Sequence, residues 1–449
     1  MLRRRLSYAA SEVAGQLVFC VISFYLLKFY TDVYGLSTVA AGFILLATRV
    51  LDAIDAPLWG VVFDKTKSRW GRSRPWFLWL SGPFALFGVL TFATPKLGGM
   101  AKVAYAAVTY GCCSVLYTGI NTPVTSILAN LTNDSGERVT LTTFRMFGSK
   151  FAVLFVNLTV LGMVARLGRG NDQRGFLLTM LLYAACSLAL YLLAFRNLKE
   201  TVAMERRSIT LRDSLRAVRG NRPWLIIVVS SFFFWIAFIA RISTAPYFFE
   251  YVLHRKGLVP LANSLDFLSL GTVMFLPYLC AKTSKRDVWM AGLVGCAAAQ
   301  LLTGLGVLMG SVAVVITGWA LGFFASGAAM AMPFSLLSDS VDYGEWRCGV
   351  RAQGFLTAIG AAFCLKAGSG LGGALPAWIL HAFGYVPNVE QTARSMTGIV
   401  LSLVWLPAIS YAIAAVPVFF YGRYERMESL MRSELEARRA MVTPVRASS

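Results

Sequence analysis

Charged side chains are scarce in this chain, because Asp, Glu, Lys and Arg together make up only 14% of its 449 residues. An ordinary soluble domain carries roughly 25%. Hydrophobic residues account for 57%, and they fill one stretch after another of about 20 residues, the length of a membrane-spanning helix. Too little polar sequence is left for a folded domain outside a membrane. The composition therefore excludes a soluble protein and predicts an all-α membrane protein.

Histidine is also scarce, and the cysteines follow no ligand-like pattern. The chain has 2 His and 8 Cys, and the cysteines lie mostly in apolar stretches, at spacings unlike those of metal ligands. They resemble small core residues. The sequence also has no His-rich cluster, nucleophile elbow or phosphate-binding loop in the context that such motifs need. We therefore predict that the chain is not an enzyme and has no disulfide framework, zinc site or cofactor.

Acidic residues are outnumbered, and the formal net charge is +20. Such an excess could suit nucleic acid, but most of the 42 Lys and Arg fall in loops on the side of the termini. This positive-inside pattern predicts an inner-membrane protein with cytoplasmic termini and lipid headgroups, not nucleic acid, as partners. The basic start runs directly into an apolar helix without a small-residue cleavage site, so no signal peptide is expected.

Hydropathy divides the chain into two sets of six spans. We predict an N-terminal half at 1–195, a polar cytoplasmic linker at 196–222, a C-terminal half at 223–421 and a tail at 422–449 that forms a short surface helix. The twelve spans are 11–30, 38–63, 76–95, 102–131, 145–166, 176–195, 223–252, 260–281, 289–308, 311–337, 352–382 and 396–421. Basic loops follow the second span of each half, as in related repeats. This pattern predicts the major facilitator architecture.

Ionisable residues inside the spans are functional candidates, because each costs at least ~2.5 kcal/mol at the bilayer centre. Arg49, Asp52 and Asp55 follow one another at i,i+3 and share one stripe of a helix. Pro57 leaves the carbonyl of Ala53 without its helical donor. The oxygen-rich stripe predicts a site for a monovalent cation. In the alternative interpretation, Arg49 and Asp52 form a purely structural pair.

A second polar patch lies in the fourth span, where Thr118 and Asn121 are one turn apart. Pro123 leaves the carbonyl of Gly119 free in the same way. Polar groups in lipid need partners, so this patch faces the second span or a wet cavity, or it bonds across a helix interface. Glu12 and Gln16 share one face of the first span.

Several longer motifs accompany these residues. They are 30–37 after the first span, 64–76 between the second and third, Glu137-Arg138 ahead of Arg145, and 339–346 after the tenth, with Lys366 inside the eleventh. With them the chain resembles the glycoside-pentoside-hexuronide:cation symporter family, the family of the melibiose permease, over nearly its whole length. The resemblance implies a monomeric secondary transporter that moves a sugar-like solute together with Na⁺ or H⁺ by alternating access.

The resemblance also assigns roles to individual positions. It implies a cation site at Asp52, Asp55 and Thr118, and a solute site at Gln16, Asn121, Thr125, Arg145 and Lys366. Loop charges would form ion pairs that close a cytoplasmic gate, or would simply be solvated, since exposed pairs contribute about 0–1 kcal/mol. These charges are Asp64, Arg69, Arg72, Arg138, Asp339, Asp342 and Glu345.

The chain departs from the family pattern in two ways. The second acid usually stands directly before the proline, where this chain has Ala56, and Asp55 comes one residue earlier. Since one residue turns a helical side chain by about 100 degrees, either Asp55 substitutes for that acid or the choice between Na⁺ and H⁺ differs. Gln16 and Asn121 are also neutral where the melibiose permease has acids.

The loss of those acids makes the predicted solute cavity more positive, because Arg145 and Lys366 are kept. A guanidinium and an ammonium attract anions, which favours an anionic glycoside or uronide. Glu12 offers a balancing charge. An exporter or a lipid or drug transporter on the same fold is the alternative function, since one fold hosts many functions.

Overall fold

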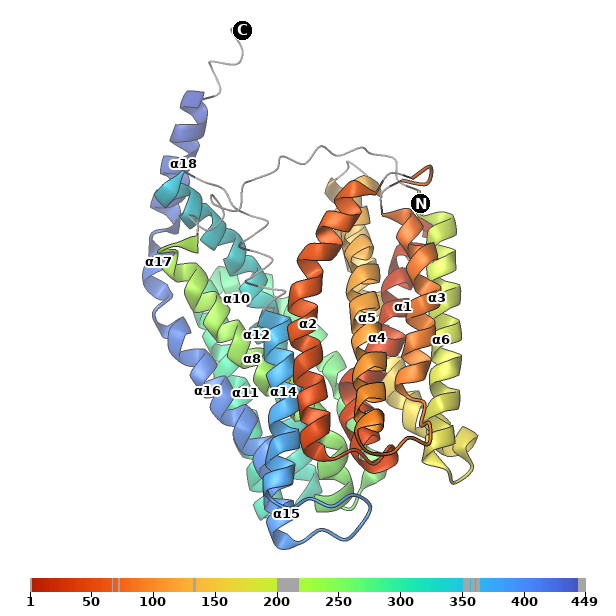
Figure 1. The fold of residues 1–449 in the computed structure, drawn as a ribbon. Coiled ribbons are helices and arrows are strands. Elements are labelled where there is room, and N and C mark those ends of the chain that lie inside the picture. The colour runs from red at the N-terminus through yellow and green to blue at the C-terminus, as the bar shows by residue number, and fades with distance from the viewer. Residues whose placement is uncertain are drawn as a thin grey trace. The chain divides into compact units, whose positions relative to one another are not determined.

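The described part of the chain is built from helices and short loops (Figure 1). The computed structural model describes residues 2–66, 68–71, 73–131, 135–199, 218–349, 356, 360 and 364–442. The chain divides into two compact units. Unit 1 comprises Met1–Arg206, Ile239–Leu265 and Gly370–Leu403, and unit 2 comprises Arg207–Phe238, Asp266–Ser369 and Val404–Ser449.

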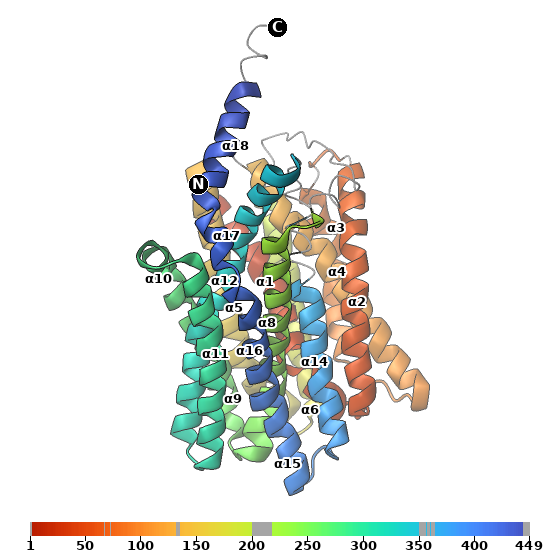
Figure 2. The same ribbon diagram turned by 90° about the vertical axis from the view of Figure 1, so that its left-hand side faces the viewer.

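Unit 1 contains the first six long helices together with short segments from later in the chain. The six are α1 (Leu2–Lys28), α2 (Thr38–Lys65), α3 (Arg74–Thr91), α4 (Gly99–Leu131), α5 (Ser135–Gly168) and α6 (Asp172–Asn197). Helix α1 packs on α5 and α6, and α3 packs on α4 and α6. Helix α2 packs on α4, and the two lie side by side in Figure 2.

The later segments of unit 1 come from the ends of two long helices and from the chain beside them. They are the end of α8 (Arg222–Tyr247), η2 (Phe248–Val252), η3 (Lys256–Leu258), α9 (Val259–Ser264), the end of α14 (Cys364–Ala382), α15 (Ala393–Val400) and the start of η6 (Leu401–Trp405). A π-helical turn, η1 (Phe29–Val33), extends α1.

Unit 2 is a second helical assembly. It contains the starts of α8 and α14 and the ends of η4 (Leu265–Phe267) and η6, with α10 (Leu268–Lys282), α11 (Lys285–Leu308), α12 (Val312–Cys348), α16 (Leu406–Phe419), α17 (Gly422–Arg426) and α18 (Glu428–Val442). Helix α11 packs on α12 and α16, and α10 packs on α12.

Local sequence signals set several helix ends. The Asn171 side chain accepts the N–H of Arg174 at 3.1 Å and begins α6, and Ser284 accepts the N–H of Asp287 at 3.0 Å and begins α11. Such caps satisfy first-turn donors that have no helical partner. Gly349, with φ +71°, ends α12 in the left-handed conformation that suits glycine.

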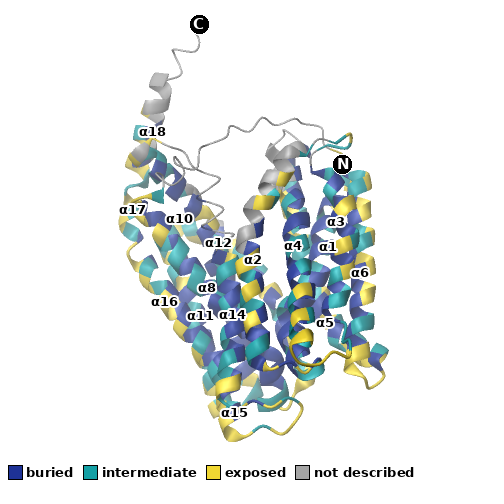
Figure 3. Ribbon diagram, viewed as in Figure 1, coloured by how far each residue is buried: buried dark blue, intermediate teal, exposed yellow. Residues whose placement is uncertain are grey.

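The helices carry the apolar exterior of a membrane protein. Within the described residues, 9 helices are long and apolar enough to cross a membrane, and the other predicted spans coincide with α2, α3 and α14. Exposed positions run along the length of α6 (Figure 3), and Val108 and Phe151 are 60% and 61% exposed. Apolar surface on this scale needs a lipid or protein partner. The all-α, multi-pass membrane fold is confirmed, and the count of twelve spans stays a prediction.

The compact units do not follow the predicted halves. Unit 1 holds all of the predicted N-terminal half and also the segments Ile239–Leu265 and Gly370–Leu403 from the predicted C-terminal half. The predicted tail forms α17 and α18, but tertiary contacts hold it as well. Glu428 pairs with Lys285 at 3.0 Å, and the Trp346 indole donates to Glu434 at 2.7 Å.

The contact between α5 and α6 makes a testable prediction. A Cβ on Gly175 would overlap the carbonyl oxygen of Val164, so we expect Gly175→Val to lower the free energy of unfolding by about 1–3 kcal/mol through overpacking. Thermal unfolding of the purified protein measures this. Gly162→Val is the matched control, because a Cβ on Gly162 meets nothing within 4 Å. Equal unfolding temperatures for the two variants would contradict this packing.

Candidate functional site

Helices α2 and α4 lie against each other in one register along the predicted cation site. A Cβ on Gly111 would lie 3.7 Å from Leu51, and one on Gly119 would lie 2.7 Å from the Trp59 ring. The Trp59 indole also donates to the carbonyl of Val115 at 3.0 Å. This register brings the polar stripe of α2 to the polar face of α4.

Asp52 is the centre of the α2–α4 contact. Its side chain is 2% exposed and lies 3.0 Å from Arg49 Nη1 through Oδ2. The Ser114 hydroxyl of α4 donates to Oδ1 at 2.6 Å. A carboxylate buried in this way is stabilised by the opposite charge and by the charge-assisted hydrogen bond. The sequence reasoning missed Ser114, although it stands one turn before Thr118.

Asp55 and Thr118 lie one turn further along the same two helices. Asp55 is 5% exposed and Thr118 is 9% exposed. Since α2 and α4 keep one register, these residues extend the polar layer that Asp52 and Ser114 begin. The three predicted cation-site residues therefore lie on facing, buried helix surfaces of unit 1.

Glu12 organises most of the predicted solute site. Its Oε2 lies 2.7 Å from Arg145 Nε of α5, and its Oε1 accepts from Gln16 at 3.0 Å. Arg145 also reaches the Thr125 hydroxyl of α4 at 3.4 Å. Side chains from α1, α4 and α5 thus converge on one cluster, which we call the Glu12–Arg145 cluster. Its charges balance within the pair.

The two remaining predicted solute residues are placed differently. Asn121 is half-buried on α4, one turn before Thr125, whose hydroxyl donates to the Asn121 carbonyl at 3.3 Å. Lys366 belongs to unit 2 and is half-buried near the start of α14. Its role in the solute site stays a prediction.

An aromatic stack lies between the two clusters. Phe19 of α1 stacks on Tyr117 of α4 at 4.7 Å between ring centres, and the Arg49 guanidinium lies 5.9 Å from the Phe19 ring. A Cβ on Gly15, next to Gln16, would lie 3.3 Å from the Tyr117 ring. Aromatic faces with a few convergent polar groups are typical of small-molecule sites. The spacing of Phe19 three residues after Gln16 is the signal that could have indicated it.

Glycines let α14 approach α2 beside the cation site. A Cβ on Gly370 would lie 2.6 Å from Arg49 Cβ, and one on Gly373 would lie 3.3 Å from Leu45. The glycine-rich segment therefore serves close helix packing, as in other membrane helices, and it holds the stem of Arg49 in place.

The predicted gate charges are only partly described. Asp339 pairs with Lys285 at 2.7 Å, inside unit 2, and the exposed Arg69 lies 4.4 Å from the Trp70 ring. Asp342 and Glu345 are half-buried near the end of α12. Arg72 and the side chains of Asp64 and Arg138 lie outside the described residues. The gate itself stays a prediction.

Glu137, which precedes Arg145 in the same motif, ties the start of α5 to the start of α1. It accepts from Arg4 and Arg5 at 3.2 Å. The hydrogen bond from Arg5, with help from Arg4, lowers the pKa of Glu137 to about 2. The carboxylate therefore stays charged at any physiological pH, and its contribution to stability is lost only as the pH falls towards 2.

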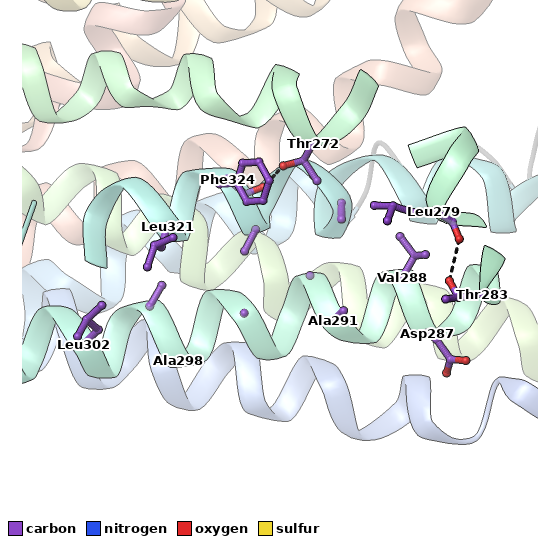
Figure 4. A pocket seen from close by; sticks show the side chains of 15 residues that line it. Thr272, Leu279, Thr283, Asp287, Val288, Ala291, Ala298, Leu302, Leu321 and Phe324 are labelled. Carbon is purple, nitrogen blue, oxygen red and sulfur yellow. Dashed lines mark hydrogen bonds between the residues drawn. The ribbon is translucent and has the colours of Figure 1, made fainter. Parts of the chain in front are cut away.

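A cavity of about 720 Å³ in unit 2 does not suit a sugar (Figure 4). Its lining is mostly aliphatic, with Leu302 and Leu321 among the residues. Its threonines bond to the helix backbone, Thr272 to Phe324 at 2.6 Å and Thr283 to Leu279 at 2.8 Å. A sugar needs donors and acceptors for its hydroxyls, and this groove between α10, α11 and α12 offers an apolar wall instead.

Comparisons with known proteins identify the family and the fold. A family model described as MFS/sugar transport protein matches residues 7–422. The isoprimeverose transporter of Lactiplantibacillus pentosus is 36% identical over 97% of this chain and 91% of its own length. The inner membrane symporter YicJ of Escherichia coli is 28% identical over 92% of this chain and 90% of its own length. The crystal structure of a D-xylose-proton symporter matches with a TM-score of 0.66 at 16% identity, over 93% of this chain and 97% of that one.

These findings define the class and then the family. The family match over residues 7–422 and the multi-pass helical fold make this chain a secondary transporter and not an enzyme. The chain belongs to the MFS/sugar transport protein family.

The Ser114–Asp52 hydrogen bond makes a prediction about the cation site. We expect Ser114→Ala to raise the cation concentration for half-maximal solute uptake about tenfold, because a hydrogen bond to a charged group contributes about 1.5–3 kcal/mol. Uptake into vesicles at graded Na⁺ and H⁺ concentrations measures it. Thr109→Val removes another buried hydroxyl of α4, one that bonds only to its own helix at 2.8 Å. Equal half-maximal concentrations in both variants would remove Ser114 from the site.

Proposed function

We propose that this chain imports a neutral glycoside together with Na⁺ or H⁺. The observation that carries the proposal is the presence of two buried ion pairs in unit 1, Arg49–Asp52 and Glu12–Arg145. The Phe19–Tyr117 stack lies between them. Buried charges are costly in a membrane and mark ion and solute pathways.

The coupling ion would be held by oxygen atoms of α2 and α4. Asp52, Asp55, Ser114 and Thr118 supply carboxylates and hydroxyls, which are the ligands that hard cations prefer. Arg49 Nη1 lies 3.0 Å from Asp52, so an arriving cation competes with this guanidinium for the same carboxylate. A proton at Asp52 would weaken the same ion pair. Na⁺ and H⁺ would therefore both act on the Arg49–Asp52 ion pair. The bound ion would take the place of the guanidinium as the positive charge beside Asp52.

The Glu12–Arg145 pair favours a neutral solute over a uronide. The argument for an anion rested on Arg145 and Lys366 without matching carboxylates. Glu12 lies 2.7 Å from the Arg145 guanidinium, and Lys366 belongs to unit 2 rather than to this cluster. A carboxylate and a guanidinium together can accept from and donate to sugar hydroxyls. The ring of the sugar would lie against Phe19 or Tyr117, whose faces suit its apolar C–H groups.

Transport by alternating access follows from the fold class. Ion binding at Asp52 and solute binding at the Glu12–Arg145 cluster would each raise the affinity for the other by the same factor. The positive-inside distribution supports the inner membrane and cytoplasmic termini. We propose a monomer surrounded by lipid.

Accumulation in energised vesicles tests the coupling. We expect Asp52→Asn to reduce gradient-driven accumulation of a neutral glycoside at least about tenfold. The neutral amide removes the negative charge that would bind the cation and so couple its gradient to uptake. Asp287→Asn is the control, since Asp287 is 53% exposed and pairs with its neighbour Arg286 at 2.7 Å. Unchanged accumulation in Asp52→Asn overturns the proposal. Gradient-driven efflux without uptake would instead support the exporter alternative.

The selectivity between uronides and neutral glycosides tests whether the solute is neutral. We expect Glu12→Gln to shift competition towards uronides by about tenfold relative to neutral glycosides, because Arg145 then carries an unbalanced charge in a partly buried site. The measurement is the ratio of inhibition constants for a uronide and its neutral glycoside. Glu390→Gln removes an exposed carboxylate from unit 1 and serves as control. A ratio that stays the same in Glu12→Gln would show that Glu12 does not set the charge preference.

A further inference from the structure

The motif at residues 30–37 buries a carboxylate that neither cluster uses. Asp32 lies in η1, at the end of α1 far from the N-terminus, and its side chain is only 2% exposed. A buried carboxylate must be hydrogen-bonded to be tolerated. The identity of its donors therefore indicates what this end of the molecule is built to do.

Two of these donors come from the predicted C-terminal half. The Tyr385 hydroxyl, beyond α14, lies 3.0 Å from both Asp32 oxygens. The Tyr251 hydroxyl, in η2 beyond α8, donates to Oδ2 at 3.2 Å. The Asn388 side chain donates to the Asp32 carbonyl at 2.8 Å. All of these residues belong to unit 1. One residue of the predicted N-terminal half thus contacts two segments of the other half, with its carboxylate on Tyr251 and Tyr385 and its backbone carbonyl on Asn388.

A charge-balanced ring supports these bonds. Lys28 lies 4.0 Å from Asp32 and also pairs with Glu250 of η2. Lys256 pairs with the same Glu250 at 3.4 Å. Two cations thus meet two carboxylates. The Thr31 hydroxyl also lies 2.8 Å from the Tyr247 hydroxyl at the end of α8. Ion pairs and hydroxyl contacts between the two predicted halves therefore lie together around η1.

We propose that Asp32, with the Tyr385 and Tyr251 hydroxyls that it accepts from, closes a gate at the end of α1 opposite its N-terminus; we call these contacts the latch. The inference rests on the proposed alternating-access function and deepens it. For this end to open, the tyrosine hydroxyls must leave the carboxylate, and water must take their place. In the closed form the latch separates the Glu12–Arg145 cluster from the solution on that side.

The chemistry of the latch suits a gate that opens in every cycle. The donors that the other half supplies to the Asp32 carboxylate are neutral hydroxyls and not a bidentate arginine. Water replaces a neutral hydroxyl at a small net difference in free energy, because both form comparable hydrogen bonds. An arginine–carboxylate fork would hold more tightly. The open and closed forms can therefore be close in free energy, and bound cargo can shift their ratio.

A native cysteine reports on the latch. Cys20 is buried on α1, between the Glu12–Arg145 cluster and Asp32, with its sulfur 3.4 Å from Gln16 Oε1. In right-side-out vesicles we expect Asp32→Ala to raise the rate at which a membrane-impermeant maleimide modifies Cys20 about tenfold. In inside-out vesicles the rate should fall. Tyr385→Phe removes one hydroxyl and should shift both rates in the same directions by a smaller factor of about three.

Controls separate gating from misfolding. Mass spectrometry of the labelled peptides also reports Cys296, which is 1% exposed in unit 2 and should keep its rate in every variant. Asp287→Asn should change neither cysteine. Opposite changes of Cys20 on the two faces support the latch. An unchanged Cys20 rate, or a rise on both faces together with Cys296, overturns it. The assay needs neither solute nor ion gradient, so its failure leaves the symport proposal to be judged by accumulation alone.

Discussion

A carboxylate buried among apolar helices needs an opposite charge or hydrogen-bond donors beside it, and this constraint shapes unit 1. Asp52 meets the constraint with Arg49 on its own helix and with Ser114 on α4. The glycines of α14 hold the arginine stem against α2. Each partner is itself positioned by packing, and an arriving cation can compete with Arg49 for the Asp52 carboxylate.

The same constraint recurs at two further places in unit 1. Glu12 pairs with Arg145 in the Glu12–Arg145 cluster. Asp32 accepts hydrogen bonds from tyrosine hydroxyls and lies near Lys28 at the far end of α1. A transporter needs interactions that break and form again in each cycle, and balanced polar contacts meet that need better than apolar packing does. The groove of unit 2 differs from these sites, because its mostly aliphatic lining offers few hydrogen-bonding groups to a polar solute.

Much of this could be predicted from the sequence. Hydropathy indicated the spans, because lipid requires about 20 apolar residues whatever the fold. The i,i+3 spacing of Asp52 and Asp55 placed both on one buried stripe, since helical periodicity alone decides that. What the spacing could not give is the register between helices. Ser114 is one hydroxyl among many until the α2–α4 packing brings it to Asp52. Glu12 was seen as a balancing charge, but its direct pair with Arg145 depends on the contact between α1 and α5. Tyr385 lies 353 residues beyond Asp32 in sequence, and no local pattern connects them.

Thermodynamic reciprocity is the most direct test of the central claim that Asp52 links ion and solute binding. The measurement is the solute dissociation constant of the purified protein with and without saturating cation, and the cation dissociation constant with and without solute. The account predicts that both constants change by the same factor in the natural protein, and that the factor falls to about one in Asp52→Asn. A solute dissociation constant that is the same with and without cation in the natural protein would contradict the proposed coupling.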